Sequence, residues 1–419
     1  MIEFKKYKLG DIADIIVSTV DKKSKAGQKE VRLCNFVDVY RNWAITHDLY
    51  DDFMVATASD VEIERFTIKK GQVAFTKDSE TRDDIGIATY IAEDFEDVVL
   101  GYHTALVTPH EDVILGKYLN AYMHSKYILK YFEMNATGSG MRYTLSLETL
   151  NDIPVLVPSL DEQRKIGDFF SSIDKQICLN VKANSKLQAL AKLMYDYWFV
   201  QFDFPDNNGL PYKSSGGKMV YDTTIKREVP EGWEVVHLFK AASVLYGFPF
   251  STEQFVEEVT PVPVVRIRDI PEGTHSAYST QKVDDKYKLE KGDVVIGMDG
   301  NFHMNIWHES ESFLNQRCVR IRTNDHEKAL SSICLFHAIE PYIQSRQATI
   351  QGSTVGHLSD KDMKQIYVLR PIVTDTFNPK VVFDTIANQI ISAKNEINRL
   401  TELRNFLIPL LLNGQASIS

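Results

Sequence analysis

The strongest constraint on the fold is an internal repeat that divides the chain into two copies of one pattern. A segment that begins at Gly138 returns in a related form at Gly352, and the match continues into the residues that follow both. A repeat of about two hundred residues indicates a duplicated domain, because solenoid repeats are only about 20 to 50 residues long. When Pro158 is aligned with Pro371, the matching pairs are Leu145 with Leu358, Ser146 with Ser359, Ile153 with Ile366, Ile173 with Ile386, Ile177 with Ile390 and Leu187 with Leu400.

Weaker matches lie upstream of both segments. Lys70–Phe75 resembles Lys291–Ile296, and each predicts a turn that leads into a buried strand. Leu9–Ile12 resembles Trp233–Val235 at the opening of the second half. We therefore predict an α/β fold of the mixed α+β kind, with two globular domains that are each followed by a long helix.

The two long helices are predicted from the spacing of their apolar residues. Residues 161–200 contain no proline and a single glycine, Gly167. At 1.5 Å per residue, about forty helical residues form a rod of about 60 Å, and the C-terminal copy over 381–412 would span about 48 Å. Steps of four and three alternate in the first helix, as in a heptad repeat. They join Ile166, Phe170, Ile173, Ile177, Asn180, Asn184, Leu187, Ala191 and Met194.

Neither helix can bury its apolar stripe alone, so the two are expected to pair. Because a globular domain separates them in the chain, we predict an antiparallel coiled coil. The alternative is that each helix packs only on its own globule, but such helices average only about a dozen residues. The predicted seam consists of Ile173, Ile177, Leu187, Ile386, Ile390 and Leu400. The predicted domains are 1–158 and 233–373 for the globules, 159–202 and 374–419 for the helices, and 203–232 for a linker.

The charge of the chain bears on its partners. The net charge is −10, which argues mildly against a nucleic-acid ligand, although binding needs only a locally positive face. The sequence has no run of eighteen apolar residues, and its start lacks the apolar core and cleavage site of a signal peptide. We expect a cytoplasmic protein that makes no membrane contact.

Polar loops of both globules carry side chains that suit DNA contacts. Arginine and lysine suit phosphates and guanine, asparagine suits adenine, and small hydroxyl residues beside glycine suit phosphate. The alternative for each loop is a solvated turn that contacts no ligand. The candidates in the first globule are Arg41, Trp43, Lys77, Arg82, Ser139 and Arg142. The candidates in the second globule are Asn301, Arg317, Ser353, Thr354 and His357.

Sequence motifs for catalysis are absent. The chain has no phosphate-binding loop of the ATP motors, no glycine-rich dinucleotide motif and no H-E-x-x-H zinc motif. Asp362 and Lys364 have the D-x-K spacing of some nucleases, but a solvated helix face explains them better. We predict no catalytic residue and no metal site. Two functions remain: a DNA reader that assembles an enzyme, and a scaffold whose coiled coil bridges other proteins without touching DNA.

Four segments resemble the conserved regions of type I restriction-modification specificity subunits. They are Pro158–Ile166, Tyr197–Pro205, Ser214–Met219 and Val229–Trp233. The resemblance covers essentially the whole chain, and the combination of segments is highly specific. One departure is that the second helix has Asn388-Gln389-Ile390 in its interior but no E-Q-R-K opening.

The resemblance implies a non-catalytic subunit of a phage-defence system. Its two target-recognition domains would each read one half of a bipartite double-stranded DNA site, with the paired helices separating them like a ruler. The helices would dock methyltransferase (modification) subunits, two in number, which bind S-adenosylmethionine and methylate adenine. Restriction subunits would complete the complex, and this chain would hold no cofactor itself.

Overall fold

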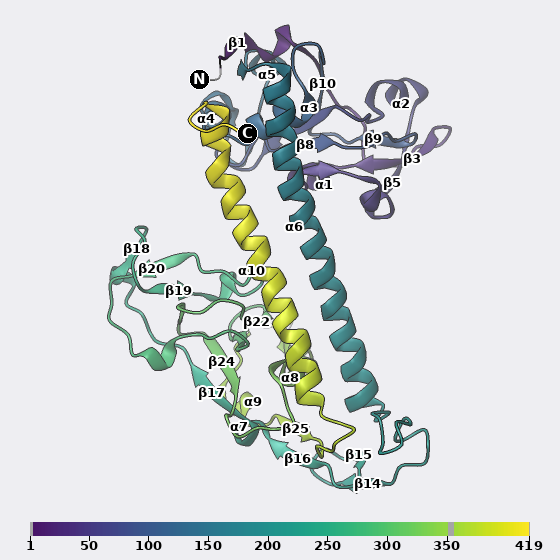
Figure 1. Cartoon of the computed structure of the whole chain (residues 1–419), viewed down its shortest axis with the longest axis vertical. Coiled ribbons are helices and arrows are strands. Elements are labelled where there is room, and N and C mark those ends of the chain that lie inside the picture. The colour runs from purple at the N-terminus through teal and green to yellow at the C-terminus, as the bar shows by residue number, and fades with distance from the viewer. Residues whose placement is uncertain (1–2, 351–355, 419) are drawn as a thin grey trace. The chain divides into compact units, whose positions relative to one another are not determined.

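The computed structural model describes residues 3–350 and 356–418 (Figure 1). The chain divides into two compact units, of which the first comprises Met1–Cys178 with Arg399–Ser419 and the second Leu179–Asn398. Each unit contains one globule together with part of each long helix. The predicted domain boundaries follow the sequence pattern and stay predictions.

The first globule is built around a five-stranded sheet in the order β2-β10-β6-β8-β4. Alternate residues of its middle strand enter different apolar clusters, Val73 and Phe75 in one and Ala74 in another, as the period of a strand requires. The strands are β2 (Ala13–Val17), β4 (Ala44–Ile45), β6 (Val73–Thr76), β8 (Ala88–Ile91) and β10 (Thr104–Pro109).

Smaller sheets and short helices surround this sheet. β1 (Lys5–Lys8) pairs with β13 (Pro154–Val157), and two three-stranded sheets have the orders β5-β3-β9 and β11-β12-β7. Their strands are β3 (Lys29–Cys34), β5 (Met54–Ala58), β7 (Asp78–Ser79), β9 (Val98–Leu100), β11 (Thr137–Ser139) and β12 (Arg142–Thr144). The helices are α1 (Phe36–Arg41), α2 (Asp60–Phe66), α3 (Gly116–Met123), α4 (Lys126–Asn135) and α5 (Leu147–Asn151), with 3-10 turns at Leu9–Asp11 and His47–Asp52.

The second globule repeats this plan with a sheet in the order β17-β24-β21-β22 and another in the order β18-β20-β19-β23. The strands of the first are β17 (Ala242–Tyr246), β21 (Val294–Gly297), β22 (Met304–Ile306) and β24 (Cys318–Thr323). The others are β18 (Phe255–Val256), β19 (Pro263–Val265), β20 (Ala277–Ser279), β23 (Phe313–Leu314), and the pairs β14 (Met219–Asp222) with β15 (Arg227–Pro230) and β16 (Glu234–His237) with β25 (Tyr367–Arg370). The helices are α7 (Leu238–Ala241), α8 (Ser332–Ile350) and α9 (Asp360–Met363), with 3-10 turns at Thr252–Gln254, Ile267–Asp269 and Asp285–Tyr287.

The predicted turn and buried strand occur in both halves. Gly71 and Gly292 have left-handed φ angles of 95° and 92°, which glycine adopts without the strain of a Cβ atom. The strands that follow, β6 and β21, are buried at every residue and occupy equivalent places, paired with β10 and β24 respectively. This prediction is confirmed.

The predicted match between Leu9–Ile12 and Trp233–Val235 is wrong in its register. Leu9 follows β1 directly, and Leu238 follows β16 directly. Both leucines are fully buried, and both strands pair antiparallel with the strand that precedes a long helix. Leu238 is therefore the counterpart of Leu9, and so short a motif was too weak to locate it.

The first long helix, α6, runs over Leu160–Tyr195 and ends in a π-helical turn at Asp196–Val200. Gln163, in the Glu162-Gln163 pair near its start, has a buried side chain that ties the helix to the globule. Its Nε2 donates to the carbonyl oxygens of Pro158 (3.0 Å) and Val113 (2.9 Å), and its Oε1 accepts from the backbone nitrogen of Leu115 at 2.8 Å.

The second long helix, α10 (Pro379–Leu412), begins differently. Proline is favoured in the first turn of a helix, where its missing N–H costs nothing. Asn378 precedes it, and its Oδ1 accepts from the backbone nitrogen of Val381 at 3.4 Å. This local start replaces the E-Q-R-K opening that the second copy lacks.

The two helices run antiparallel within each unit (Figure 1). In the first unit, Ile173 and Ile177 from the early part of α6 share an apolar cluster with Leu400 from the late part of α10. In the second unit, the late part of α6 meets the early part of α10, and Leu187 shares a cluster with Ile386 and Ile390. Helices that packed only on their own globules would not mix in this way, so the antiparallel coiled coil is confirmed.

Candidate nucleic-acid interface

The first globule gathers two of its predicted loops on one small sheet. β12 pairs with β11 on one side and with β7 on the other, so the hairpin around Gly140 lies beside the loop that follows β7. Ser139 pairs with Arg142 across the hairpin, and both are exposed. Arg82 is also exposed, and its guanidinium carbon lies 5.3 Å from the centre of the Tyr143 ring. Two predicted residues of the hairpin and one from a loop about sixty residues earlier in the sequence therefore share one surface.

A hollow in this surface mixes both signs of charge. Arg142 lines it together with carboxylates from Asp78, Glu80 and Asp84. Carboxylates accept hydrogen bonds from the amino group of cytosine, whereas arginine donates to guanine or phosphate. A mixed surface of this kind suits base reading better than simple attraction of the phosphate backbone. Arg41 is exposed at the end of α1, which also contributes residues to the hollow.

Lys77 is held by neighbouring side chains. Its Nζ donates to Thr144 Oγ1 at 2.7 Å and lies 3.2 Å from Asp78 Oδ1. Only 19% of the side chain is exposed. Burial acts to raise the pKa of Asp78, but hydrogen bonds from Thr144 and His103 and the charge of Lys77 outweigh it and lower that pKa. Lys77 therefore supports an ionised carboxylate rather than projecting toward solvent.

Trp43 lies in the core, and its prediction as a DNA-contacting residue is a misinterpretation of the loop. The side chain is 8% exposed, and its ring stacks on His124 with centroids 4.3 Å apart. The guanidinium carbon of Arg404, a residue of α10, lies 4.6 Å from the centre of the Trp43 ring. Its sequence neighbours Arg41 and Asn42 are polar, but the hydrophobic effect places so large a ring inside.

The second globule gathers its candidates around Asp299. Arg317 Nη1 lies 3.1 Å from Asp299 Oδ2, and His357 Nδ1 lies 2.6 Å from Asp299 Oδ1. Arg317 and His357 remain 58% and 49% exposed. Asn301 is exposed two residues further along the same loop. The structure thus brings two predicted residues, Arg317 and His357, to one carboxylate, with a third, Asn301, nearby in the same loop. Ser353 and Thr354 lie outside the described residues.

Two residues of the first globule were not predicted. Asp78 and His103 form a pair in which His103 Nδ1 lies 2.5 Å from Asp78 Oδ2. The ring of Tyr102 lies 3.9 Å from the ring of His103. Tyr102 and His103 follow a buried strand, β9, which is a signal that sequence reasoning could have used.

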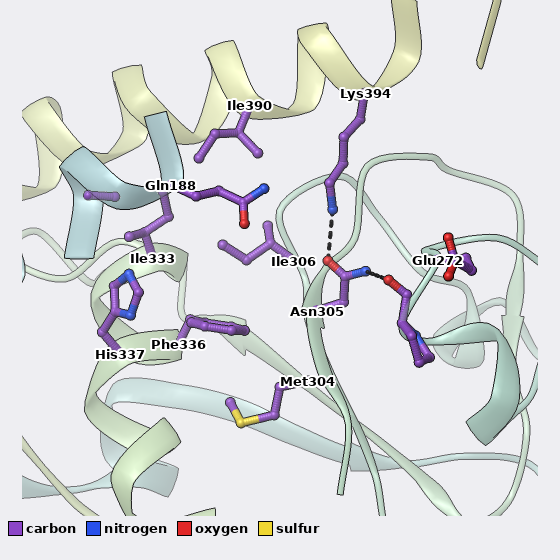
Figure 2. A pocket seen from close by; sticks show the side chains of 12 residues that line it. Gln188, Glu272, Met304, Asn305, Ile306, Ile333, Phe336, His337, Ile390 and Lys394 are labelled. Carbon is purple, nitrogen blue, oxygen red and sulfur yellow. Dashed lines mark hydrogen bonds between the residues drawn. The ribbon is translucent and has the colours of Figure 1, made fainter. Parts of the chain in front are cut away.

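The second globule meets the helices at a polar junction within its unit (Figure 2). Lys394 on α10 reaches Asn305 on β22, and its Nζ donates to Asn305 Oδ1 at 2.8 Å. The Asn305 amide donates in turn to the carbonyl oxygen of Ile270 at 2.7 Å. Burial lowers the pKa of Lys394, although Glu272 acts to raise it. One turn further along α10, Asn398 Nδ2 lies 3.1 Å from His308 Nε2. These contacts orient the globule on α10.

Side chains for metal catalysis are not clustered in the described part of the chain. No group of three histidine, cysteine, aspartate or glutamate residues there could hold a metal ion. Burial raises the pKa of the thiols of Cys34, Cys318 and Cys334. Among the described helices, none is long and apolar enough to cross a membrane.

Comparisons with known proteins agree with the duplicated architecture. The sequence matches the family described as the type I restriction modification DNA specificity domain over residues 1–189 and 230–401. It is 22% identical to the type I restriction enzyme HindI specificity subunit of Haemophilus influenzae, in an alignment that covers 99% of this chain and all of that protein. The EcoBI specificity subunit of Escherichia coli is 26% identical over 175 residues, which are 42% of this chain and 36% of that protein.

A solved structure shares the fold. The crystal structure of the type I restriction-modification system S subunit from M. genitalium superposes with a TM-score of 0.55, at 13% identity and with 98% of this chain and 96% of that chain covered. The family match extends over both globules and most of both helices. The chain therefore belongs to the family of type I restriction-modification DNA specificity subunits.

Proposed function

We propose that this chain reads a bipartite, asymmetric site on double-stranded DNA, one half with each globule, and has no catalytic activity of its own. It would dock two adenine-methyltransferase subunits, which hold S-adenosylmethionine, and restriction subunits would join the full complex. The observation that carries this proposal is the duplication of one globule with different polar loops, because two different half-sites need two different readers on one scaffold.

The geometry of the loops supports DNA as the ligand. Each globule places arginine side chains on an exposed surface beside carboxylates, at Arg142 in the first and at Arg317 in the second. Side chains of both kinds read base edges, whereas the net charge of −10 makes nonspecific binding to phosphates weak. Such a protein would bind tightly only to DNA whose base sequence matches these side chains.

Exposed apolar residues on α6 and its π-helical turn support the docking of other subunits. Leu193, Tyr197 and Val200 recur at steps of four and three, and they are 66%, 38% and 50% exposed. Residues at these spacings lie on one helix face, and exposed apolar patches mark protein interfaces.

Co-expression of the chain with the methyltransferase encoded beside its gene tests the proposal. Adenine methylation is then mapped across the host genome. We expect a single bipartite motif that disappears when the gene for this chain is deleted. An unchanged methylation pattern, with the two proteins still co-purifying, would instead support a scaffold that bridges proteins without reading DNA.

A further inference from the structure

The two globules place a carboxylate at equivalent positions. The ladder between β6 and β10 reaches Thr76, and the ladder between β21 and β24 reaches Gly297. Asp78 and Asp299 each lie two residues beyond these positions. The side chains are 17% and 25% exposed, so each carboxylate is partly enclosed at the same corner of its sheet.

Each carboxylate holds a nitrogen-bearing side chain from an equivalent position. His103 directly precedes β10, and Arg317 directly precedes β24. His103 Nδ1 lies 2.5 Å from Asp78 Oδ2, and Arg317 Nη1 lies 3.1 Å from Asp299 Oδ2. The same pair of positions therefore carries an Asp–His pair in one globule and an Asp–Arg pair in the other.

The backbone around both pairs is also equivalent. The carbonyl oxygen of His103 accepts from the backbone nitrogen of Lys77, and that of Arg317 accepts from Met298, at 2.8 Å in both cases. The φ angles of His103 and Arg317 are 71° and 72°. In the described part of the chain only five non-glycine residues have a left-handed φ, and these are two of them.

A left-handed conformation costs a side-chain-bearing residue energy that glycine would not lose. Both globules nevertheless retain a side chain there, and the two side chains differ. A purely structural turn would favour glycine in both. Both globules keep the strained backbone at this position but carry different side chains there. Two domains that read different half-sites would need such a difference.

Both side chains keep nitrogen atoms for a ligand. With Nδ1 directed at Asp78, the described residues offer no hydrogen-bond partner to Nε2 of His103, whose side chain is 35% exposed. The carboxylate sets the tautomer, since an ionised acceptor requires the proton on Nδ1. Arg317 directs Nη1 at Asp299 and leaves Nε and Nη2 without a partner among the described residues.

We propose that His103 and Arg317 each read a base edge in the major groove, and that Asp78 and Asp299 are positioning residues that orient them. This inference rests on the proposed function. Arg317 reads guanine, because a guanidinium donates to guanine O6 and N7 in the commonest specific contact. When the ring carries one proton, held on Nδ1 by Asp78, Nε2 of His103 is an acceptor for the amino group of adenine or cytosine. The two residues therefore specify positions in different half-sites.

The test is methylation mapping with full-length variants co-expressed with the methyltransferase encoded beside the gene. We expect Arg317→Ala to relax one guanine position in one half-site, and His103→Ala to relax one position in the other, each by about tenfold to a hundredfold in discrimination. Asp299→Asn and Asp78→Asn should relax the same positions less strongly. Matched controls are His110→Ala, which breaks another His–Asp pair, and Arg268→Ala, which removes another exposed arginine.

Two further variants separate recognition from structure. His103→Gly relieves the backbone strain, so we expect an unchanged or higher melting temperature together with a relaxed half-site. Arg317→Lys keeps the charge but loses the two-pronged geometry, so discrimination should fall as in Arg317→Ala. If Arg317→Lys retained full discrimination, or if all variants left both half-sites unchanged, the inference would be wrong. A wild-type complex that methylates no bipartite motif would overturn the proposed function itself.

Discussion

Arg404 of α10 places its guanidinium carbon 4.6 Å from the centre of the Trp43 ring in the first globule. His124 stacks on the same indole ring, with centroids 4.3 Å apart. Arg404 Nη1 also lies 3.8 Å from Asp174 Oδ1 on α6. One cation therefore joins the globule and both helices within the first unit, and a tryptophan predicted for DNA contact serves this joint.

The carboxyl group of Asp174 should make the first unit sensitive to pH. Burial raises its pKa to about 6, although Arg404 and Cys178 act to lower it. Because the folded pKa lies above the unfolded value of about 4, the stabilising contribution is complete below about pH 4 and is lost as the pH rises through about 6. We expect Asp174→Asn to gain up to about 3 kcal/mol relative to wild type between pH 4 and pH 7.

Urea unfolding at both pH values, followed by tryptophan fluorescence, measures this difference. Asp168→Asn is the control, because that carboxylate is exposed on the same helix. A difference between wild type and Asp174→Asn that stays constant from pH 4 to pH 7 would contradict the assignment.

Gln163 should contribute more to stability than its polar side chain suggests. Gln163→Ala removes three hydrogen bonds and leaves the buried carbonyl oxygen of Pro158 and the partly buried one of Val113 without this donor. We expect a loss of about 1 to 3 kcal/mol in the free energy of unfolding, since unsatisfied buried groups keep their full desolvation cost. Chemical denaturation measures it, with Arg164→Ala at the exposed neighbouring position as the control. Equal effects of the two substitutions would show that the motif does not anchor the helix.

The seam between the helices should not tolerate a charge. Ile390 is 3% exposed within the apolar cluster of the second unit, whereas Leu190 on α6 is 44% exposed. We expect Ile390→Asp to lower the free energy of unfolding by about 3 to 5 kcal/mol and Leu190→Asp by less than about 1 kcal/mol. Thermal unfolding followed by circular dichroism compares them. A fully native Ile390→Asp variant would mean that the seam residues are assigned to the wrong helix face.

Arg142 should contribute to DNA affinity in a salt-dependent way. It is exposed on β12 at the rim of the mixed-charge hollow. We expect Arg142→Ala to weaken binding of target DNA by the assembled complex and, if the side chain contacts a phosphate, to reduce the slope of log affinity against log salt by about 1. Fluorescence anisotropy over a salt series measures both, with Lys130→Ala as the control for an exposed cation elsewhere in the same unit. Affinity that is unchanged at every salt concentration would remove this hairpin from the interface.

The sequence by itself determined the architecture. Matching residues such as Ile177 and Ile390 showed the duplication, and apolar steps of four and three indicated the paired helices, because burial of an apolar stripe requires a second surface. The segment Pro158–Ile166 stood out in the sequence, and the physical role of its Gln163 followed once the three hydrogen bonds of that side chain were located.

Only the tertiary structure decided which polar residues act together. Asp78 and His103 lie apart in the sequence, and their pairing depends on the register between β6 and β10. Trp43 was predicted to contact DNA because its sequence neighbours are polar. In the folded chain the ring is buried, and Arg404 covers it. Local patterns record periodicity along one chain segment, whereas strand register and the burial of a single ring are set by contacts between segments far apart in the sequence.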